Sequence, residues 1–232
     1  MPERFGLYYA PPVTSELWRR AAIWLGRDAA TGATLEADIG GVDPERRHVI
    51  TTSARRYGFH ATLKAPMALD GKLEGKDLDR AIKAWAGVNA PVSIGRIVLR
   101  PLEGFLALVP EAQPAALTDF TAKIVGDFDG FRAPLRPEDK ARRNAGGHLT
   151  PRQLELIDRF GYPYVMEEFR FHMTLTDRLE DEERRTTAAA ITEWLGPLIG
   201  QELLLDRLVL FHEAEPGAPF RRLRDYPLGG EA

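Results

Sequence analysis

The chain has 232 residues, of which 44% are hydrophobic and 28% are charged. This composition is typical of a globular protein with a substantial core and excludes an intrinsically disordered chain. Its 31 Lys and Arg against 34 Asp and Glu give a formal net charge of −3, which argues against extended nucleic acid as a partner. Without cysteine, the chain has no disulfide, no thiolate metal ligand and no cysteine nucleophile.

Two segments bear on the compartment in which the protein works. Residues 1–12 contain no apolar run of the length that a signal peptide needs. The most apolar stretch, residues 203–211, is interrupted by Asp206 and Arg207 and is too short to span a bilayer. We therefore expect a soluble, cytoplasmic protein with no membrane partner.

The first half of the chain, about residues 1–129, is predicted to contain both strands and helices. Runs of β-branched and aromatic residues predict strands, and apolar residues at helical spacing behind Thr14 or Ser15 predict the first helix. The charged, glycine-bearing stretch 26–47 is predicted to be loop. In chain order we expect a strand at 5–9, a helix at 17–26, a strand at 57–69, a helix at 76–88, strands at 92–100 and 105–109, and a helix at 115–128.

Residues 130–150 form a basic insertion that we expect to be partly irregular, because it combines prolines and glycines with several cations. Its Arg142 and Arg143 have two interpretations: a solvated turn, or a lid that grips a second phosphate. The second half, about residues 151–232, begins with a helix capped by Thr150 and ended by Gly161. It continues with a strand at 169–176, a helix at 182–195 and strands at 203–211 and 220–226.

An internal repeat is the main signal. Residues 59–63, Phe-His-Ala-Thr-Leu, recur as residues 171–175, Phe-His-Met-Thr-Leu, with four of five positions identical. The same order of strand, helix, strand, turn and strand follows both copies. We infer two related halves, each a small antiparallel sheet with helices.

Strand alternation assigns the side chains of each copy to two faces. In the second copy the apolar side chains of residues 169, 171, 173 and 175 share one face, and the other face carries Arg170, His172, Thr174 and Thr176. In the first copy the polar face carries His60, Thr62 and Lys64. If a pseudo-two-fold axis relates the halves, the two polar faces meet in one cleft.

Two histidines on opposite sides of a phosphorus atom suit the opening of a cyclic phosphodiester. A neutral imidazole takes a proton from water, and an imidazolium gives a proton to the leaving alkoxide. Thr62 and Thr174 can donate hydrogen bonds to phosphate oxygens. Lys64 and Arg170 can offset the phosphate charge, or they can be solvated edge residues.

The paired motifs resemble those of the 2H phosphoesterase superfamily, which includes the bacterial RNA ligase-like 2′,5′ enzymes and cyclic nucleotide phosphodiesterases. More closely, residues 57–64, 161–165 and 169–176 resemble the DUF1045 family of phosphonate-metabolism proteins. Residues 8–12, Tyr-Tyr-Ala-Pro-Pro, and residues 24–28, Trp-Leu-Gly-Arg-Asp, fit the same family. The resemblance covers nearly the whole chain.

This resemblance implies an α+β fold of two pseudo-two-fold-related lobes, each an antiparallel sheet with helices on its outer face, around a central cleft. The whole chain, 1–232, would form this single bilobal domain. The implied activity is metal-independent hydrolysis of a small cyclic phosphodiester, without a cofactor. His60 and His172 would be catalytic, and Thr62 and Thr174 would bind phosphate. The link to phosphonate metabolism suggests a ribose-type cyclic phosphate, such as 5-phosphoribosyl 1,2-cyclic phosphate.

Two other functions stay open at this point. One is an RNA 2′,3′-cyclic phosphodiesterase or 2′,5′ ligase-like enzyme, and the other is a binding module that holds a phosphate ligand without turnover. A metal site is less well supported, because the sequence has no His-x-His or His-Glu-x-x-His spacing. Thr176, Tyr162 and Tyr164 are further candidates for substrate binding, although the two tyrosines can also simply cap the preceding helix. The sequence leaves the oligomeric state open.

Overall fold

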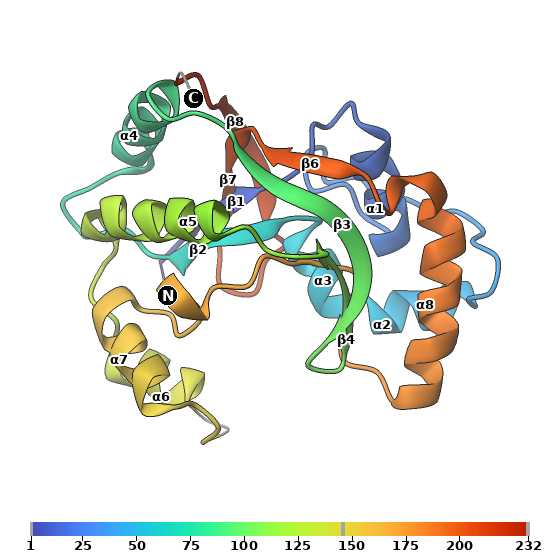
Figure 1. The fold of residues 1–232 in the computed structure, drawn as a ribbon. Helices are drawn as coiled ribbons and strands as arrows, with labels where there is room; N and C mark the ends of the chain where they lie inside the picture. Colours follow the sequence, from blue (N-terminus) through green and yellow to red (C-terminus); the bar gives the residue numbers. More distant parts are fainter. Residues whose placement is uncertain (1, 145–146, 231–232) are drawn as a thin grey trace.

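The computed structural model describes residues 2–144 and 147–230, except the side chain of Arg142. Ala145 and Gly146, which belong to the predicted insertion, lie outside the described residues. Within the described part, the chain forms two four-stranded antiparallel sheets with helices packed around them (Figure 1). The predicted α+β class with two sheet-based lobes is therefore confirmed. No helix in these ranges has the length and apolar character needed to cross a membrane.

One edge strand of each sheet begins directly after a motif histidine. The first sheet has the order β2 (Ala61–Met67), β1 (Arg4–Tyr9), β7 (Arg207–Glu213) and β8 (Arg221–Pro227). The second has the order β5 (Met173–Thr174), β4 (Phe105–Pro110), β3 (Val92–Leu102) and β6 (Glu202–Leu205). Strands β2 and β5 thus hold equivalent edge positions in the two sheets.

The two sheets do not coincide with the two halves of the sequence. After β2 the chain passes through a helix and enters the second sheet as β3. After β5 it passes through a helix and adds β6 to the second sheet before β7 enters the first. The expectation that each half forms a sheet of its own is therefore wrong. The prediction of one continuous strand at 203–211 is also wrong. The chain is divided at Asp206 into β6 and β7, which belong to different sheets.

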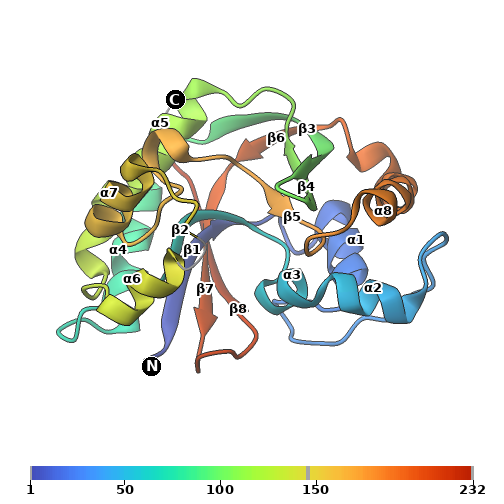
Figure 2. The same ribbon diagram turned by 90° about the horizontal axis from the view of Figure 1, so that it is seen from below.

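The helices gather in two groups on either side of the sheets (Figure 2). Helix α4 packs against β7 and β8, α8 packs against β3 and β4, and α5 contacts both β2 and β3. The first group comprises α4 (Gly75–Gly87), α5 (Ala115–Asp127), α6 (Pro137–Arg143) and α7 (Pro151–Phe160). The second comprises α1 (Glu16–Leu25), α2 (Pro44–Ile50), α3 (Thr52–Tyr57) and α8 (Asp181–Leu195).

The helix ends follow the predicted caps. Ser15 Oγ accepts a hydrogen bond from the Trp18 N–H, and Gly26 ends α1 in the left-handed conformation. Thr150 and Gln153 form a reciprocal capping box at the start of α7. These ends were predictable because each depends on residues that are neighbours in the sequence.

Two predicted segments differ in the structure. The predicted loop 26–47 ends early, because α2 begins at Pro44, and the predicted strand 57–69 begins only at Ala61, because α3 occupies residues 52–57. The carboxylate of Asp177 accepts hydrogen bonds from the backbone N–H groups of Ser53 and Ala54 and so caps α3 from the other half of the chain. Such a cap is invisible in the local sequence.

The second motif forms less strand than predicted. Only Met173–Thr174 pair with β4, whereas residues 169–172 and 175–176 lie outside any strand. The predicted alternation nevertheless holds, since the side chains at 169, 171, 173 and 175 are buried in the main core. The Nε1–H of Trp24 donates to the Leu175 carbonyl and ties α1 to the end of this segment.

Gly58 links α3 to the first motif in a backbone conformation that suits only glycine. Its φ is 81° and its ψ is 172°, a region that side chains other than hydrogen rarely allow. A Cβ at this position would also lie 2.5 Å from Cβ of Ala29. The turn between α3 and His60 therefore requires glycine.

We predict that Gly58→Ala lowers the free energy of unfolding by about 1–3 kcal/mol, because the substitution imposes both backbone strain and a steric clash. Urea denaturation of the purified protein measures this change. Gly126→Ala is the matched control: Gly126 is exposed in α5 with open space around it, so the same substitution should raise the stability by about 0.5–1 kcal/mol. Equal stability of Gly58→Ala and the unmodified protein would contradict the prediction.

Candidate active site

A cleft of about 460 Å³ lies where the two motif segments meet. Its lining includes His60 and Thr62 from the first motif and His172 and Thr174 from the second. Both histidines stand immediately before the motif strands β2 and β5, and both side chains are half-buried. The structure therefore brings together the two polar faces that the repeat predicted, although their catalytic and phosphate-binding roles stay predictions.

The two imidazoles are held by the same contact. Nδ1 of His60 lies 2.8 Å from the Gly58 carbonyl oxygen, and Nδ1 of His172 lies 2.8 Å from the Arg170 carbonyl oxygen. In both cases the carbonyl belongs to the residue two positions earlier. Because a carbonyl oxygen only accepts, Nδ1 carries the proton in both rings. The Nε2 atoms are then the ones that accept a proton when the rings are neutral and donate one when they are charged.

The surroundings of the two imidazoles differ. The ring of His60 stacks on Tyr8 with a centroid distance of 3.9 Å, whereas Phe105 lies at 5.8 Å from His172 in a tilted arrangement. Burial lowers the pKa of His60 to about 4. The hydrogen bond to the Gly58 carbonyl raises this pKa, whereas the nearby charge of His172 lowers it. Burial also lowers the pKa of His172. The first ring is therefore the more strongly held in its neutral form.

The three threonines of the two motif segments have different surroundings. Oγ1 of Thr62 lies 3.2 Å from Nε2 of His60, and both groups face the cleft. Thr174 also lines the cleft. Thr176 lines it as well, but its buried Oγ1 accepts a hydrogen bond from the Leu106 N–H, so this hydroxyl holds the second motif against β4.

The two predicted cations of the motif strands do not line the cleft. The pairing of β2 with β1 shifts by one residue between Thr62 and Lys64, which marks a β-bulge at Leu63. Lys64 is therefore buried, and its Nζ donates to the carbonyl of Val125 in the last turn of α5 and pairs with Asp129 just after that helix. The prediction that Lys64 shares the face of His60 is wrong, because the bulge interrupts the alternation.

Arg170 takes part in the site through its backbone. Its carbonyl orients His172, and its exposed side chain lines a neighbouring cavity of about 200 Å³ together with Tyr164. Tyr164 stacks edge-on against Tyr162 at a centroid distance of 5.6 Å. Tyr162 lines this cavity and the cleft, so of the two predicted tyrosines it is the one that reaches the histidines' cavity.

The basic insertion is more regular than predicted, because residues 137–143 form α6. Arg143 lines the cleft, and its guanidinium lies 5.5 Å from the Tyr162 ring centroid. Arg142 also belongs to α6, but its side chain lies outside the described part of the chain. Arg143 therefore fits the interpretation of substrate binding better than that of a solvated turn.

The cleft residues that the sequence analysis missed include Arg4, Tyr8 and Tyr57. Arg4 and Tyr8 lie on β1, two steps either side of Gly6, and this alternation of polar residues around a glycine was a usable signal. Tyr57 is the first residue of the predicted strand 57–69. It ends α3 instead and stacks on Phe220 with its ring 4.8 Å away, while it also lines the cleft.

Among the described residues, no group of three or more His, Cys, Asp or Glu side chains is arranged to hold a metal ion. Asp177 also lines the cleft. Its carboxylate accepts hydrogen bonds from the backbone N–H groups at the start of α3. The cleft therefore offers imidazole, hydroxyl and guanidinium groups together with the carboxylate of Asp177.

Two curated relatives are similar to this chain, and both are named ribose 1,5-bisphosphate phosphokinase PhnN. The one from Janthinobacterium sp. (strain Marseille) is 34% identical over 233 residues, which cover 98% of this chain and 51% of the relative. The one from Laribacter hongkongensis (strain HLHK9) is 32% identical over 230 residues, which cover 95% and 51%. The chain therefore spans about half the length of the curated relatives it matches.

Two solved structures align along nearly the whole chain with low sequence identity. A crystal structure described as a phosphoesterase is 12% identical with a TM-score of 0.42, and the alignment covers 98% of this chain and 99% of that one. The crystal structure of TT0787 of Thermus thermophilus is 16% identical with a TM-score of 0.45, and the alignment covers 99% and 100%.

The family comparison is the one that assigns the chain. The profile of the DUF1045 family, described as a protein of unknown function, matches residues 62–221. The match covers more than half of the chain and spans the second histidine motif and the strands from β3 to β7. This chain belongs to the DUF1045 family.

Proposed function

We propose that this protein hydrolyses a small cyclic phosphodiester by general acid–base catalysis with His60 and His172. The observation that carries the proposal is the matched pair of Nδ1–carbonyl contacts, which leaves two Nε2 atoms for proton transfer in one cleft. Two imidazoles supply both proton transfers, so the reaction needs no metal ion.

In the proposed reaction, neutral His60 removes a proton from a water molecule through Nε2. The water oxygen forms a bond to phosphorus, and the ring bond from phosphorus to the opposite oxygen breaks. His172, protonated at Nε2, gives its proton to the leaving oxygen, so the products are a phosphomonoester and a free hydroxyl. Thr174 donates a hydrogen bond to a non-bridging phosphate oxygen, where charge builds up. The Thr62 hydroxyl, which contacts Nε2 of His60 in this structure, turns to a second phosphate oxygen when the substrate binds and frees Nε2 for the water molecule.

The assignment of base and acid follows from the different surroundings of the two rings. His60 is stacked on Tyr8 and has the pKa of about 4, so it is neutral at the pH where His172 still holds its proton. A neutral imidazole with the proton on Nδ1 is the form that a general base requires. His172 has no comparably close ring among the described residues, which suits the general acid.

The comparisons support a ribose phosphate as the substrate class. Both curated relatives carry ribose 1,5-bisphosphate in their name. Opening a ribose 1,2-cyclic phosphate at the 2-oxygen leaves a ribose 1-phosphate. The ribose 1,5-bisphosphate in that name also carries a phosphate at position 1. The kinase activity itself is not part of the proposal, because this chain has no Gly-x-x-x-x-Gly-Lys-Ser/Thr loop for ATP phosphates. The family resemblance supports a role for the proposed reaction in phosphonate metabolism.

We predict that His60→Gln and His172→Gln each lower kcat by about 10²–10⁴-fold, because each removes one proton-transfer group. Steady-state hydrolysis of ribose 1,2-cyclic phosphate measures the loss. His48→Gln is the control, since His48 is exposed on α2, away from the cleft. Near-normal turnover in either motif variant would overturn the two-histidine mechanism.

The dependence of kcat/KM on pH tests the assignment of the two roles. Activity should rise as pH increases through about 4, where His60 loses its proton, and fall as pH passes the pKa of His172, which burial holds below 6.5. The maximum should therefore lie on the acidic side of pH 6.5. The residual activity of His172→Gln should lose the alkaline limb, and loss of the acid limb instead would reverse the assignment.

A substrate panel measured in EDTA tests the reaction class. We expect hydrolysis of ribose 1,2-cyclic phosphate to continue at an unchanged rate, because no step uses a metal ion. Preference for a nucleoside 2′,3′-cyclic phosphate, with binding that weakens steeply as salt rises, would favour an RNA end as substrate. Binding without turnover of any member would indicate a ligand-binding module, and complete loss of activity in EDTA would indicate a metal enzyme.

A further inference from the structure

The segment that leads to His172 is held by a side chain where a neighbouring strand is lacking. Only Met173–Thr174 pair with β4, and residues 169–172 lie outside any strand. Gln113, in the connection between β4 and α5, bonds to this segment instead. Its Oε1 accepts a hydrogen bond from the Phe171 N–H at 2.7 Å, and its Nε2 donates to the Phe169 carbonyl at 3.1 Å. One side-chain amide thus bonds to the backbone on both sides of Arg170.

The partners of Gln113 determine which way its amide points. A backbone N–H only donates and a carbonyl only accepts, so Oε1 must face Phe171 and Nε2 must face Phe169. Nε2 also donates to Oγ1 of Thr118, near the start of α5, at 2.8 Å. Three hydrogen bonds therefore hold this half-buried side chain in one orientation.

The Phe171 N–H belongs to the same peptide group as the Arg170 carbonyl, and that carbonyl accepts the Nδ1–H of His172. Because a peptide group is planar, a hydrogen bond to its N–H also fixes the direction of its C=O. The two bonds form a chain from Oε1 of Gln113 through one peptide group to the imidazole, and bonds in such a chain polarise one another. Gln113 thus acts on His172 from a distance, since it lines neither of the two cavities beside that ring.

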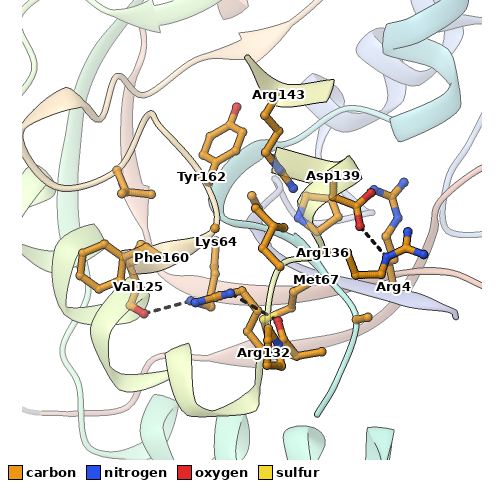
Figure 3. A pocket seen from close by; sticks show the side chains of 18 of the residues that line it. Arg4, Lys64, Met67, Val125, Arg132, Arg136, Asp139, Arg143, Phe160 and Tyr162 are labelled. Atoms are coloured by element: carbon orange, nitrogen blue, oxygen red, sulfur yellow. Dashed lines mark hydrogen bonds and ion pairs between the residues drawn. The ribbon is translucent and has the colours of Figure 1, made fainter. Parts of the chain in front are cut away.

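Helix α5 connects Gln113 to the first motif as well. Gln113 lies just before the start of this helix, and Val125 lies in its last turn. The Val125 carbonyl accepts a hydrogen bond from Nζ of Lys64, which belongs to the strand that follows His60 (Figure 3). The segments of both motifs are therefore bonded to the same helix or to the residue before it, which gives Gln113 a fixed position relative to the cleft.

The two imidazoles differ in what holds them besides their carbonyl partners. The ring of His60 stacks on Tyr8 with a centroid distance of 3.9 Å. The ring of His172 has Phe105 at 5.8 Å in a tilted arrangement, which restrains it less. The orientation of His172 therefore depends more on the direction of the Arg170 carbonyl, and this is the group that Gln113 fixes.

We propose that Gln113 is a positioning residue for His172, which holds the imidazole in its Nδ1–H tautomer through the peptide group between Arg170 and Phe171. This inference rests on the proposed function for the role of His172 as the general acid. After His172 gives its Nε2 proton to the leaving oxygen, the neutral ring keeps the proton on Nδ1, and the Arg170 carbonyl stabilises that form. Without Gln113 the carbonyl can turn, and the ring can exchange its tautomers.

The test measures the tautomers of both motif histidines by ¹⁵N NMR, without substrate and at a pH where both rings are neutral. We expect the Nδ1–H form at His60 and His172 in the unmodified protein. Gln113→Met should convert His172 to a mixture with the Nε2–H form and leave His60 unchanged. It should also lower kcat for ribose 1,2-cyclic phosphate by about 10- to 100-fold, the effect of a misplaced catalytic group, and change KM by less than about twofold.

Two further variants give the comparison its controls. Gln201→Met is the matched substitution at an exposed glutamine just before β6, and it should leave both tautomers and kcat unchanged. In Gln113→Glu the carboxylate still accepts the Phe171 N–H but cannot donate to the Phe169 carbonyl. His172 should therefore keep the Nδ1–H form in this variant, with a smaller loss of kcat than in Gln113→Met.

An unchanged His172 tautomer in Gln113→Met would overturn the proposal, and so would loss of the Nδ1–H form in Gln113→Glu. If Gln113→Met does not fold, hydrogen exchange in the unmodified protein decides: the Phe171 amide should exchange slowly although it lies outside any strand, and exchange at the rate of an unstructured peptide refutes the proposal. If no cyclic phosphate is hydrolysed, the proposed function fails, whereas the tautomer measurements still decide the role of Gln113.

Discussion

The hydrogen bond from an imidazole Nδ1–H to the carbonyl two residues earlier is the interaction on which the site depends, and the chain makes it twice. It fixes the tautomer of each ring and directs Nε2 away from the backbone. It also makes the function of each imidazole depend on the local backbone, which is why the left-handed Gly58 belongs to the site although its side chain contributes nothing. A ring without this bond could rotate and exchange its tautomers.

The crossing of the chain between the sheets brings the two rings together. Strands β2 and β5 are edge strands, and each histidine stands at the start of such an edge. Because β3 and β7 each join the sheet of the other motif, the two sheets are linked by strands from both halves and cannot separate as independent units. Side chains from both motifs therefore line the cleft without long connecting loops. Thr62 and Thr174 are held in place by the backbone hydrogen bonds of strands β2 and β5.

The two motif strands differ in the residue that pairs with the motif threonine. Tyr8 lies opposite Thr62 in the first sheet, and Ala107 lies opposite Thr174 at the equivalent place in the second. The large ring in one half packs against His60, and the small residue in the other leaves His172 without such a partner. The difference between Tyr8 and Ala107 therefore gives two similarly held imidazoles different surroundings.

The sequence by itself determined the features that depend on neighbouring residues: the α+β class, the caps at Ser15 and Thr150, and the repeated motif with its apolar and polar faces. Alternation and capping are local properties of the backbone, so a single sequence reveals them. Only the tertiary structure decided that Lys64 leaves the polar face, since the bulge at Leu63 arises from pairing with β1. It also decided α3, whose cap comes from distant Asp177, and the division of the chain at Asp206 between two sheets. These features depend on contacts between residues far apart in the chain, and no local pattern carries them.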